Sequence, residues 1–516
     1  MNKPNGGIAV TDEIIFAPTE NGAGTSVYDS DVNSEIAEDF TLPDYLPEIR
    51  RLLRVTPSFS CPSGYTGSTD AEFAGNADWS VLYVGGDGKP ATANLSSSYE
   101  VTAPVSPDLP LDRGAGLHAE HSVCAESVTG KVTAPRKLSV KSRLRHHIRV
   151  TGERNTQTEL HGCTSDESIK KLDKTYVTLV TEKGMNDSTE AETVFPTEAG
   201  AKVIGVRASA AVNSCLPSDM GAVCRGTVVF TLLCTSPEGE TVASESRVAF
   251  EAPVELDLDG EGWCLSGYAY VNGVTSDEAE GSLVCRATLC IECYARKNAP
   301  VKLTCDIYST EQTTSPEFDT FKVPYLILCT NTEFSHDGSA VFDGLPEGAK
   351  ILDCVCDAQP TGMRFENGKY LLDVKFRYNI LFGAGDEYTC REAEQSFSAE
   401  VGAGNEEPSG YSARLTVMTC RAKTEGENIA LSADIAAEVA VFGETEIKAV
   451  TSAEFGEKSA NRRAAWTVAY AAPGETLWDI AKRYSADPAE LAAANGLKYS
   501  SPDADDSLAG TNFLIV

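Results

Sequence analysis

The chain has 516 residues, of which 42% are hydrophobic and 23% are charged. At roughly 150 residues per domain, this length predicts three or four domains rather than one core. Its 43 basic and 76 acidic residues give a formal net charge of −33, and the acidic residues are spread along the chain. This charge favours solubility and disfavours nonspecific binding to nucleic acid or anionic lipid, so we expect neither as a partner.

The N-terminal residues 1–10 lack the run of about 7 to 15 apolar residues that marks a signal peptide. No segment approaches the ~18 apolar residues needed to cross a bilayer, so we expect a cytosolic protein without a membrane span. The 16 cysteines are few for this length, and many, such as Cys285 and Cys354, lie in apolar runs. We interpret them as small buried hydrophobic residues that stay reduced.

Four landmarks recur in the same order three times along the chain. They are an apolar strand start, a longer apolar strand before a turn, an aromatic residue before small residues, and a long alternating strand. In the first copy they lie at 52–55, 79–84, 99–101 and 138–150. In the second copy they lie at 203–206, 229–234, 250–252 and 283–295, and in the third at 351–354, 376–382, 397–399 and 431–442. We interpret them as three copies of one structural repeat.

Within these runs apolar and polar residues alternate, and β-branched and aromatic residues are common. A period of two is typical of antiparallel strands. Polar stretches at 151–174, 308–319 and 455–465 are expected to connect the units. We therefore predict a mainly β protein, with three tandem antiparallel β repeat domains followed by a small β-α-α-β domain. The predicted boundaries are 8–155, 168–310, 316–455 and 464–516.

One strand of the first repeat, 137–150, carries a concentrated basic face, and Leu138, Val140, Leu144, Ile148 and Val150 lie on its other face. The basic residues are Lys137, Lys141, Arg143, Arg145, His147 and Arg149. Two interpretations stay open. The stripe docks an acidic partner or a phosphate-bearing surface, or its charges protect an exposed sheet from aggregation.

His118, His121 and Cys124 are residue types that bind zinc. On a strand, however, His118 and Cys124 share one face while His121 points to the other, and no fourth ligand is near in the sequence. Cys290 and Cys293 likewise lack a second pair of cysteines. We therefore predict no metal site and no cofactor.

Catalytic motifs are missing from the sequence. It contains no Gly-x-x-x-x-Gly-Lys-Ser/Thr phosphate loop, no Gly-x-Ser-x-Gly elbow and no His-Glu-x-x-His helix. Carboxylate pairs occur everywhere in so acidic a chain, so they do not identify a site. We predict that the protein is not an enzyme and assign no catalytic residue.

The clearest helical signals lie in the C-terminal segment 466–516. Thr476 and Asp479 have the spacing of a capping box at the start of a helix. Asp487 before Pro488 starts a second helix, which Asn495–Gly496 ends. Short strands at 466–470 and 513–516 flank the two helices.

The segments 473–484 and 493–497 of this unit closely resemble the LysM family. The resemblance implies binding of glycans that contain N-acetylglucosamine, through the first strand–helix loop and the loop after the second helix. The second loop departs from the family pattern. It is long and acidic, with Asp503, Asp505 and Asp506, and Ala509 stands where the family usually has proline.

Three β repeats before a LysM unit, and the entry segment 42–49, resemble the SPOCS-domain spore coat assembly proteins of endospore-forming bacteria. The resemblance spans nearly the whole chain. It implies a cytoplasmic protein of the mother cell that gathers on the forespore surface. It also implies that LysM binds protein and ties the coat-nucleating morphogenetic ATPase to other coat proteins.

Our first hypothesis is a noncatalytic scaffold of spore envelope and coat assembly, whose several weak sites raise effective concentration on a surface. The alternative is a protein whose LysM unit recognises peptidoglycan or its precursors. Trp478, next to Lys482, is the best candidate anchor for a partner, although its ring would also cover the core of the small unit. The predicted partner-binding residues are Gly474, Glu475, Thr476, Trp478, Lys482 and Arg483.

Overall fold

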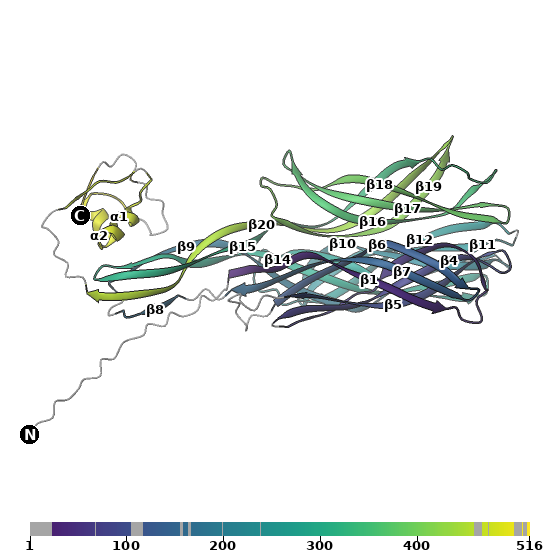
Figure 1. Cartoon of the computed structure of the whole chain (residues 1–516), viewed down its shortest axis with the longest axis horizontal. Coiled ribbons are helices and arrows are strands. Elements are labelled where there is room, and N and C mark those ends of the chain that lie inside the picture. The colour runs from purple at the N-terminus through teal and green to yellow at the C-terminus, as the bar shows by residue number, and fades with distance from the viewer. Residues whose placement is uncertain are drawn as a thin grey trace, which may run out of the picture.

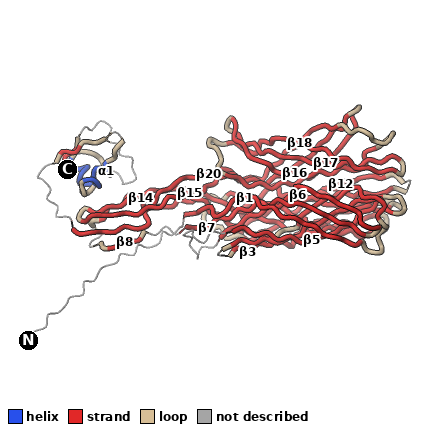
Figure 2. The backbone as a smooth tube through the Cα atoms, viewed as in Figure 1, coloured by secondary structure: helices blue, strands red, loops and turns tan. Residues whose placement is uncertain are grey.

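The fold is that of a computed structural model of the chain (Figure 1). The structure describes residues 23–67, 69–104, 117–154, 158–163, 167–198, 200–237, 239–458, 467–472, 474–499, 508 and 513–516. Strands dominate these segments, and their helices are two short ones at the C-terminal end (Figure 2). The prediction of a mainly β protein is confirmed. Neither helix has the length and apolar character that crossing a membrane requires.

The first repeat is built from two antiparallel sheets. One sheet has the order β1-β7-β6, and in the other β4 pairs with β5 on one edge and with β2 and β3 on the other. The strands are β1 (Ala23–Thr41), β2 (Ile49–Phe59), β3 (Ser63–Thr66), β4 (Asp70–Gly85), β5 (Pro90–Pro104), β6 (Leu117–Ala134) and β7 (Lys137–Arg154).

The second and third repeats have the same topology. In each of these two repeats the first strand and the last two form one sheet, as in β13-β14-β9, and the three strands between them form the other, as in β10-β11-β12, whereas the first repeat adds the short β3 to its second sheet. The second repeat contains β9 (Ile169–Pro196), β10 (Lys202–Ser218), β11 (Gly221–Thr235), β12 (Thr241–Glu255), β13 (Cys264–Ala279) and β14 (Ser282–Ser309). The third contains β15 (Gln312–Ala340), β16 (Lys350–Glu366), β17 (Lys369–Ala384), β18 (Glu387–Ala403), β19 (Gly410–Glu425) and β20 (Asn428–Lys458).

Each repeat buries a core between its two sheets. The central strands β4, β11 and β17 place the aromatic residues Trp79, Phe230 and Phe376 in these cores. The facing strands β7, β14 and β20 contribute aliphatic side chains to the same clusters. The alternation in the sequence therefore produces one apolar layer per repeat, because successive side chains of a strand point to opposite faces.

Equivalent β-bulges join the three repeats. In β2, β10 and β16 the residues Leu53, Ile204 and Leu352 are skipped by the pairing with the neighbouring strand. A bulge redirects a side chain out of the regular alternation. These three side chains meet in one apolar cluster with Leu82, Val84, Leu233, Leu381, Tyr388 and Cys390. The shared landmark of the three repeats therefore forms a contact between them.

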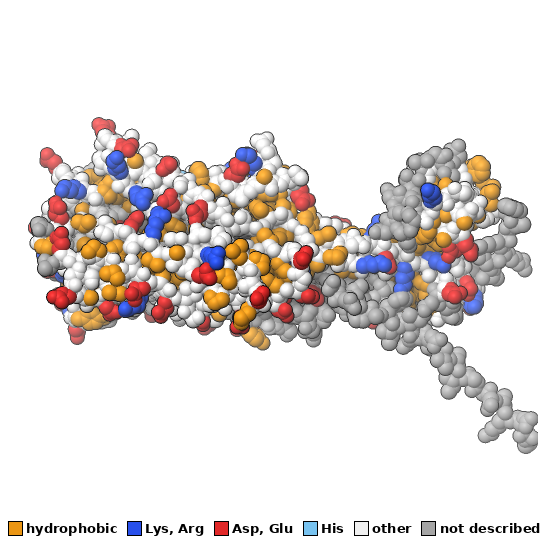
Figure 3. Space-filling view, turned by 180° about the vertical axis from the view of Figure 1, so that it is seen from behind, with side chains coloured by type: hydrophobic (Ala, Val, Ile, Leu, Met, Phe, Trp, Pro, Cys, Tyr) orange, Lys and Arg blue, Asp and Glu red, His pale blue; other side chains and the backbone are white. Residues whose placement is uncertain are grey.

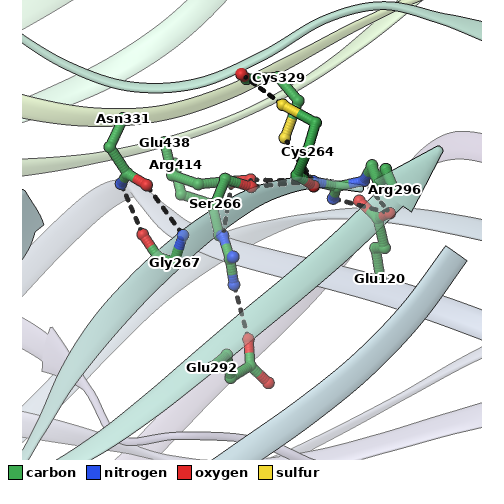
Figure 4. A network of polar contacts seen from close by, with 10 residues as sticks. All are labelled: Glu120, Cys264, Ser266, Gly267, Glu292, Arg296, Cys329, Asn331, Arg414 and Glu438. Atoms are coloured by element: carbon green, nitrogen blue, oxygen red, sulfur yellow. Dashed lines mark hydrogen bonds and ion pairs between the residues drawn. The ribbon is translucent and has the colours of Figure 1, made fainter. Parts of the chain in front are cut away.

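A buried network of ion pairs also ties the repeats together (Figure 4). Arg296 of β14 contacts Glu120 of β6 at 2.9 Å and Glu438 of β20 at 3.3 Å. Arg414 of β19 bridges Glu438 and Glu292 at 3.2 and 2.6 Å. The Arg296 side chain is fully buried, so its charge is balanced by the two carboxylates rather than by water.

A second, smaller ion-pair cluster takes one side chain from each repeat. The carboxylate of Asp353 in β16 accepts hydrogen bonds from Arg54 of β2 at 2.6 Å and from Arg207 of β10 at 2.7 Å. Asp353 and Arg54 are buried. Burial raises the pKa of Asp353, but the two guanidinium groups outweigh it and hold the pKa below its usual value.

The long strands β9, β14, β15 and β20 continue beyond the three repeats as two stacked ribbons, which we call the stem (Figure 1). Their inner faces bury Val301, Phe321 and Ile447, and β8 (Glu159–His161) pairs with β20 near the end. We predicted polar connectors at 151–174 and 308–319, but Ile169 onward and Gln312 onward lie in β9 and β15. Pairing with the neighbouring strands satisfies their backbone groups, and some of their polar side chains, such as Gln312, are buried.

Candidate functional site

The C-terminal unit has the predicted β-α-α-β order. Strand β21 (Val468–Ala469) pairs antiparallel with β22 (Leu514–Ile515), and α1 (Leu477–Arg483) and α2 (Pro488–Ala494) lie between them in the sequence. The predicted Trp466 and Pro473 lie outside the described residues, as do Asp503, Asp505, Asp506 and Ala509 of the second loop.

The helix starts follow from local chemistry. The Thr476 hydroxyl accepts a hydrogen bond from the Asp479 backbone N–H, and the Asp479 carboxylate accepts one from the Thr476 N–H, which completes the predicted capping box. The Asp487 carboxylate caps α2 by accepting from the backbone N–H groups of Ala489 and Glu490. Asn495 is the C-cap of α2, as predicted.

The predicted anchor Trp478 faces the chain itself. Its side chain is 5% exposed, and its indole Nε1 donates to Oδ2 of Asp306 in β14 at 2.8 Å. The indole ring also meets the ring of Tyr308 edge to face, with centroids 4.9 Å apart. Trp478 therefore covers the small core and at the same time binds the tip of the stem.

Three more polar contacts hold the C-terminal unit on the stem. The Lys482 ammonium contacts the second oxygen of Asp306 at 2.5 Å. The Tyr308 hydroxyl donates to the backbone carbonyl of Ala486 at 2.8 Å. The Lys170 ammonium of β9 contacts the Asp487 carboxylate at 2.5 Å. Both helices are thus attached to the stem through named side chains.

The electrostatics of this contact favour the docked state at neutral pH. Burial raises the pKa of Asp487, but the hydrogen bonds from Lys170 and from the backbone N–H groups outweigh it, so that the pKa lies below its usual value. Burial raises the pKa of Tyr308, so its hydroxyl stays protonated and able to donate. The Asp487 carboxylate is therefore ionised at neutral pH where it contacts Lys170.

The other predicted partner-binding residues stabilise the loop between β21 and α1. Gly474 has a φ of +82°, which glycine adopts without strain. The Glu475 carboxylate accepts from the Ala472 N–H at 2.9 Å and pairs with Arg483. Together with the capping Thr476, these residues order the loop that precedes α1.

An exposed face of the unit escaped the sequence analysis. Val468, Tyr470 and Phe513 are 49%, 71% and 55% exposed, and we call them the outer face. Val468 lies opposite Ile515 in the ribbon, while the alternate residues Ala469 and Leu514 are buried on the other side. Hydrophobic side chains are visible at the outer edge of this lobe in Figure 3. The period-two alternation in these short strands was the signal available in the sequence.

The basic stripe divides into two parts. Lys137, Lys141 and Arg143 are exposed, and Arg143 pairs with Glu126 at 3.1 Å. Arg145, by contrast, donates to the carbonyl of Pro360 in the third repeat at 2.8 Å. The buried Arg149 guanidinium stacks on the Phe442 ring, 3.4 Å from its centroid. His147 hydrogen-bonds Asp31 at 3.0 Å. The second half of the stripe therefore contacts the body of the protein, which the alternation of β7 alone did not reveal.

The residues considered for zinc point to different surroundings. His121 is buried in the first repeat, where its Nε2 lies 3.0 Å from Nδ1 of His146 and its ring stacks on Phe73. The Cys124 thiol instead contacts the guanidinium of Arg145 at 3.6 Å. His118 lies on the same strand, β6, and is half-buried.

Comparison with known protein families decides the nature of the C-terminal unit. Residues 472–508 match the LysM domain family. The chain carries a LysM domain. This match covers only the C-terminal end of the chain. No curated protein and no solved structure matches the chain. A LysM domain is a binding module for glycan or protein, so the docked unit and its outer face form the candidate functional site.

Proposed function

We propose that this chain is a noncatalytic scaffold of spore envelope and coat assembly. In this proposal it works in the cytoplasm of the mother cell and is recruited to the forespore surface. There its LysM domain binds protein and links the coat-nucleating morphogenetic ATPase to other coat proteins. The resemblance of the three repeats and the LysM unit to SPOCS-domain proteins supports this assignment.

The observation that carries the proposal is the two-sided LysM domain. Its Trp478 and Lys482 bind Asp306 of the stem, so these contacts hold the domain at the tip of the stem. Its outer face, with Tyr470 71% exposed, points away from the buried side of the ribbon. Exposed aromatic side chains on a fixed support are typical anchors of protein interfaces, because little freedom is lost on binding.

Localisation in a sporulating cell tests the biological part of the proposal. A fluorescent fusion of the full chain should gather on the forespore surface of an endospore-forming host only when the morphogenetic ATPase is present. Uniform fluorescence in the mother cell, or the same pattern without the ATPase, would contradict the scaffold role. A fusion that is secreted would point to the alternative, recognition of peptidoglycan.

A further inference from the structure

Three thiols meet in the core of the second repeat. Cys215 of β10, Cys224 of β11 and Cys293 of β14 have sulfur atoms that all lie within 4.8 Å of one another. The Cys215 and Cys224 sulfurs are 3.1 Å apart. Because β14 belongs to the opposite sheet from β10 and β11, the cluster connects the two layers of the sandwich.

A β-bulge brings Cys215 to this cluster. Along β10 the pairing passes from Val212 to Ser214 and skips Asn213. Val212 points into the core, and in a regular strand the next residue to point inward would be Ser214. Because of the bulge, Ser214 is exposed instead, and Cys215 lies opposite Cys224. The Asn213 side chain accepts a hydrogen bond from Thr227 at 3.0 Å, which holds the bulge in place.

A glycine makes room for the sulfur of Cys215. Gly267 of β13 pairs with Cys293, and a Cβ atom built on it would lie 2.8 Å from the Cys215 sulfur. Its backbone is fixed on both sides, because the Asn331 amide accepts from its N–H at 2.9 Å and donates to its carbonyl at 2.7 Å. The space around the three sulfurs is therefore preformed.

The burial of the three thiols differs. Cys224 and Cys293 are fully buried, whereas Cys215 is half-buried next to the exposed Leu216, which leaves a way in from the surface. The three thiols would bind a metal ion as thiolates.

We propose that Cys215, Cys224 and Cys293 form a trigonal site for one monovalent copper ion. Soft thiolate ligands select soft ions such as Cu(I) and Zn(II), and structural zinc sites are almost always four-coordinate. Among the described residues no His, Asp or Glu side chain joins the three cysteines within ligand distance. Three sulfur donors without a fourth favour Cu(I), whose binding releases the thiol protons.

The three cysteines do not stand out in the sequence, because they are not neighbours in the chain. Cys293 was considered with Cys290, but the thiols that approach it come from β10 and β11. Cys354 and Cys420 of the third repeat also lie close together, with sulfurs 2.9 Å apart, and Cys356 contacts Cys420 as well, but these three sulfurs do not all lie within 4.8 Å of one another. The site must therefore be tested against a background of other thiols.

The test uses the reduced full chain without oxygen, titrated with Cu(I) in competition with the chromophoric chelator bicinchoninate. The wild type should take one more equivalent of Cu(I) from the chelator than Cys215→Ala does. The matched variant Cys285→Ala should take as much Cu(I) as the wild type. Cys285 is a good control because it is fully buried in the same strand and core cluster as Cys293. X-ray absorption should show three sulfur neighbours for the additional ion.

A second measurement does not depend on the folding of a variant. In moderate urea, where buried thiols become accessible to the reagent, one equivalent of Cu(I) should protect Cys215, Cys224 and Cys293 together from alkylation, as read by mass spectrometry of peptides. Equal copper uptake by Cys215→Ala and the wild type would overturn the proposal. Tighter binding of Zn(II) at these thiols would overturn it too, as would a Cys215–Cys224 disulfide in place of the ion.

Discussion

Trp478 and Asp306 are 172 residues apart in the sequence, yet the indole Nε1 of the first donates to the carboxylate of the second at 2.8 Å. The other oxygen of the same carboxylate accepts a hydrogen bond from the Lys482 ammonium. Hydrogen bonds to a charged group contribute about 1.5–3 kcal/mol each. This shared carboxylate therefore accounts for much of the contact between the LysM domain and the stem.

Replacing Asp306 by Asn should release the LysM domain. The amide keeps the shape of the side chain but cannot form the ion pair with Lys482, and we expect docking to weaken by about 2 kcal/mol. Hydrogen–deuterium exchange of α1 should increase in the variant. Asp173→Asn on the same stem is the control, because Asp173 contacts Lys302 and Thr304 instead. Equal protection of α1 in wild type and Asp306→Asn would contradict the docking account.

Replacing Arg296 by Met should destabilise the body of the protein by roughly 3–5 kcal/mol, because Glu120 and Glu438 would then be left in a buried site without their partner. Urea unfolding followed by circular dichroism measures the change. Arg286→Met on the same strand is the control. Arg286 pairs with Glu192 and Asp277 at an exposed position, where water screens the ion pairs, so their loss should change stability little. If Arg296→Met lowered the free energy of unfolding no more than the control does, the network would not stabilise the contact between the repeats.

Acid should destabilise the first repeat through two histidines. Burial lowers the pKa of His146 to about 4, and it lowers the pKa of His121 well below its usual value. Between pH 6.5 and 4 the unfolded chain binds protons that the folded chain does not, so the free energy of unfolding falls as the pH falls. His146 alone should contribute roughly 3 kcal/mol to this loss.

The variant His121→Phe checks this pH dependence. Phe fills the stacked position beside Phe73 but cannot be protonated, so the unfolding free energy of the variant should fall less steeply between pH 6.5 and 4. Parallel pH profiles of wild type and His121→Phe would show that His121 is not among the groups responsible.

Features set by neighbouring residues could be predicted from the sequence. The capping box of Thr476 and Asp479, the cap of Asp487 and the alternation of the long strands depend on spacings of two to four residues. The mainly β fold and the helices of the LysM domain followed from them.

Features set by strand packing could not be predicted in this way. The inward position of Trp478 depends on Asp306 of a distant strand, and the burial of Arg149 depends on Phe442 of the third repeat. A bulge reverses the facing of every later residue in its strand, so Cys215 could not be assigned to the core from alternation alone. The outer face was missed for another reason, since strands as short as β21 and β22 carry little periodic signal.

Binding of the purified morphogenetic ATPase to the full chain tests the central claim most directly. Biolayer interferometry should show saturable binding that Tyr470→Ser weakens at least tenfold, because Tyr470 is the most exposed aromatic side chain of the outer face. Met220→Ser, which replaces an exposed apolar side chain of the second repeat, should bind as the wild type does. Saturable binding of N-acetylglucosamine oligomers without any binding of the ATPase would contradict the account.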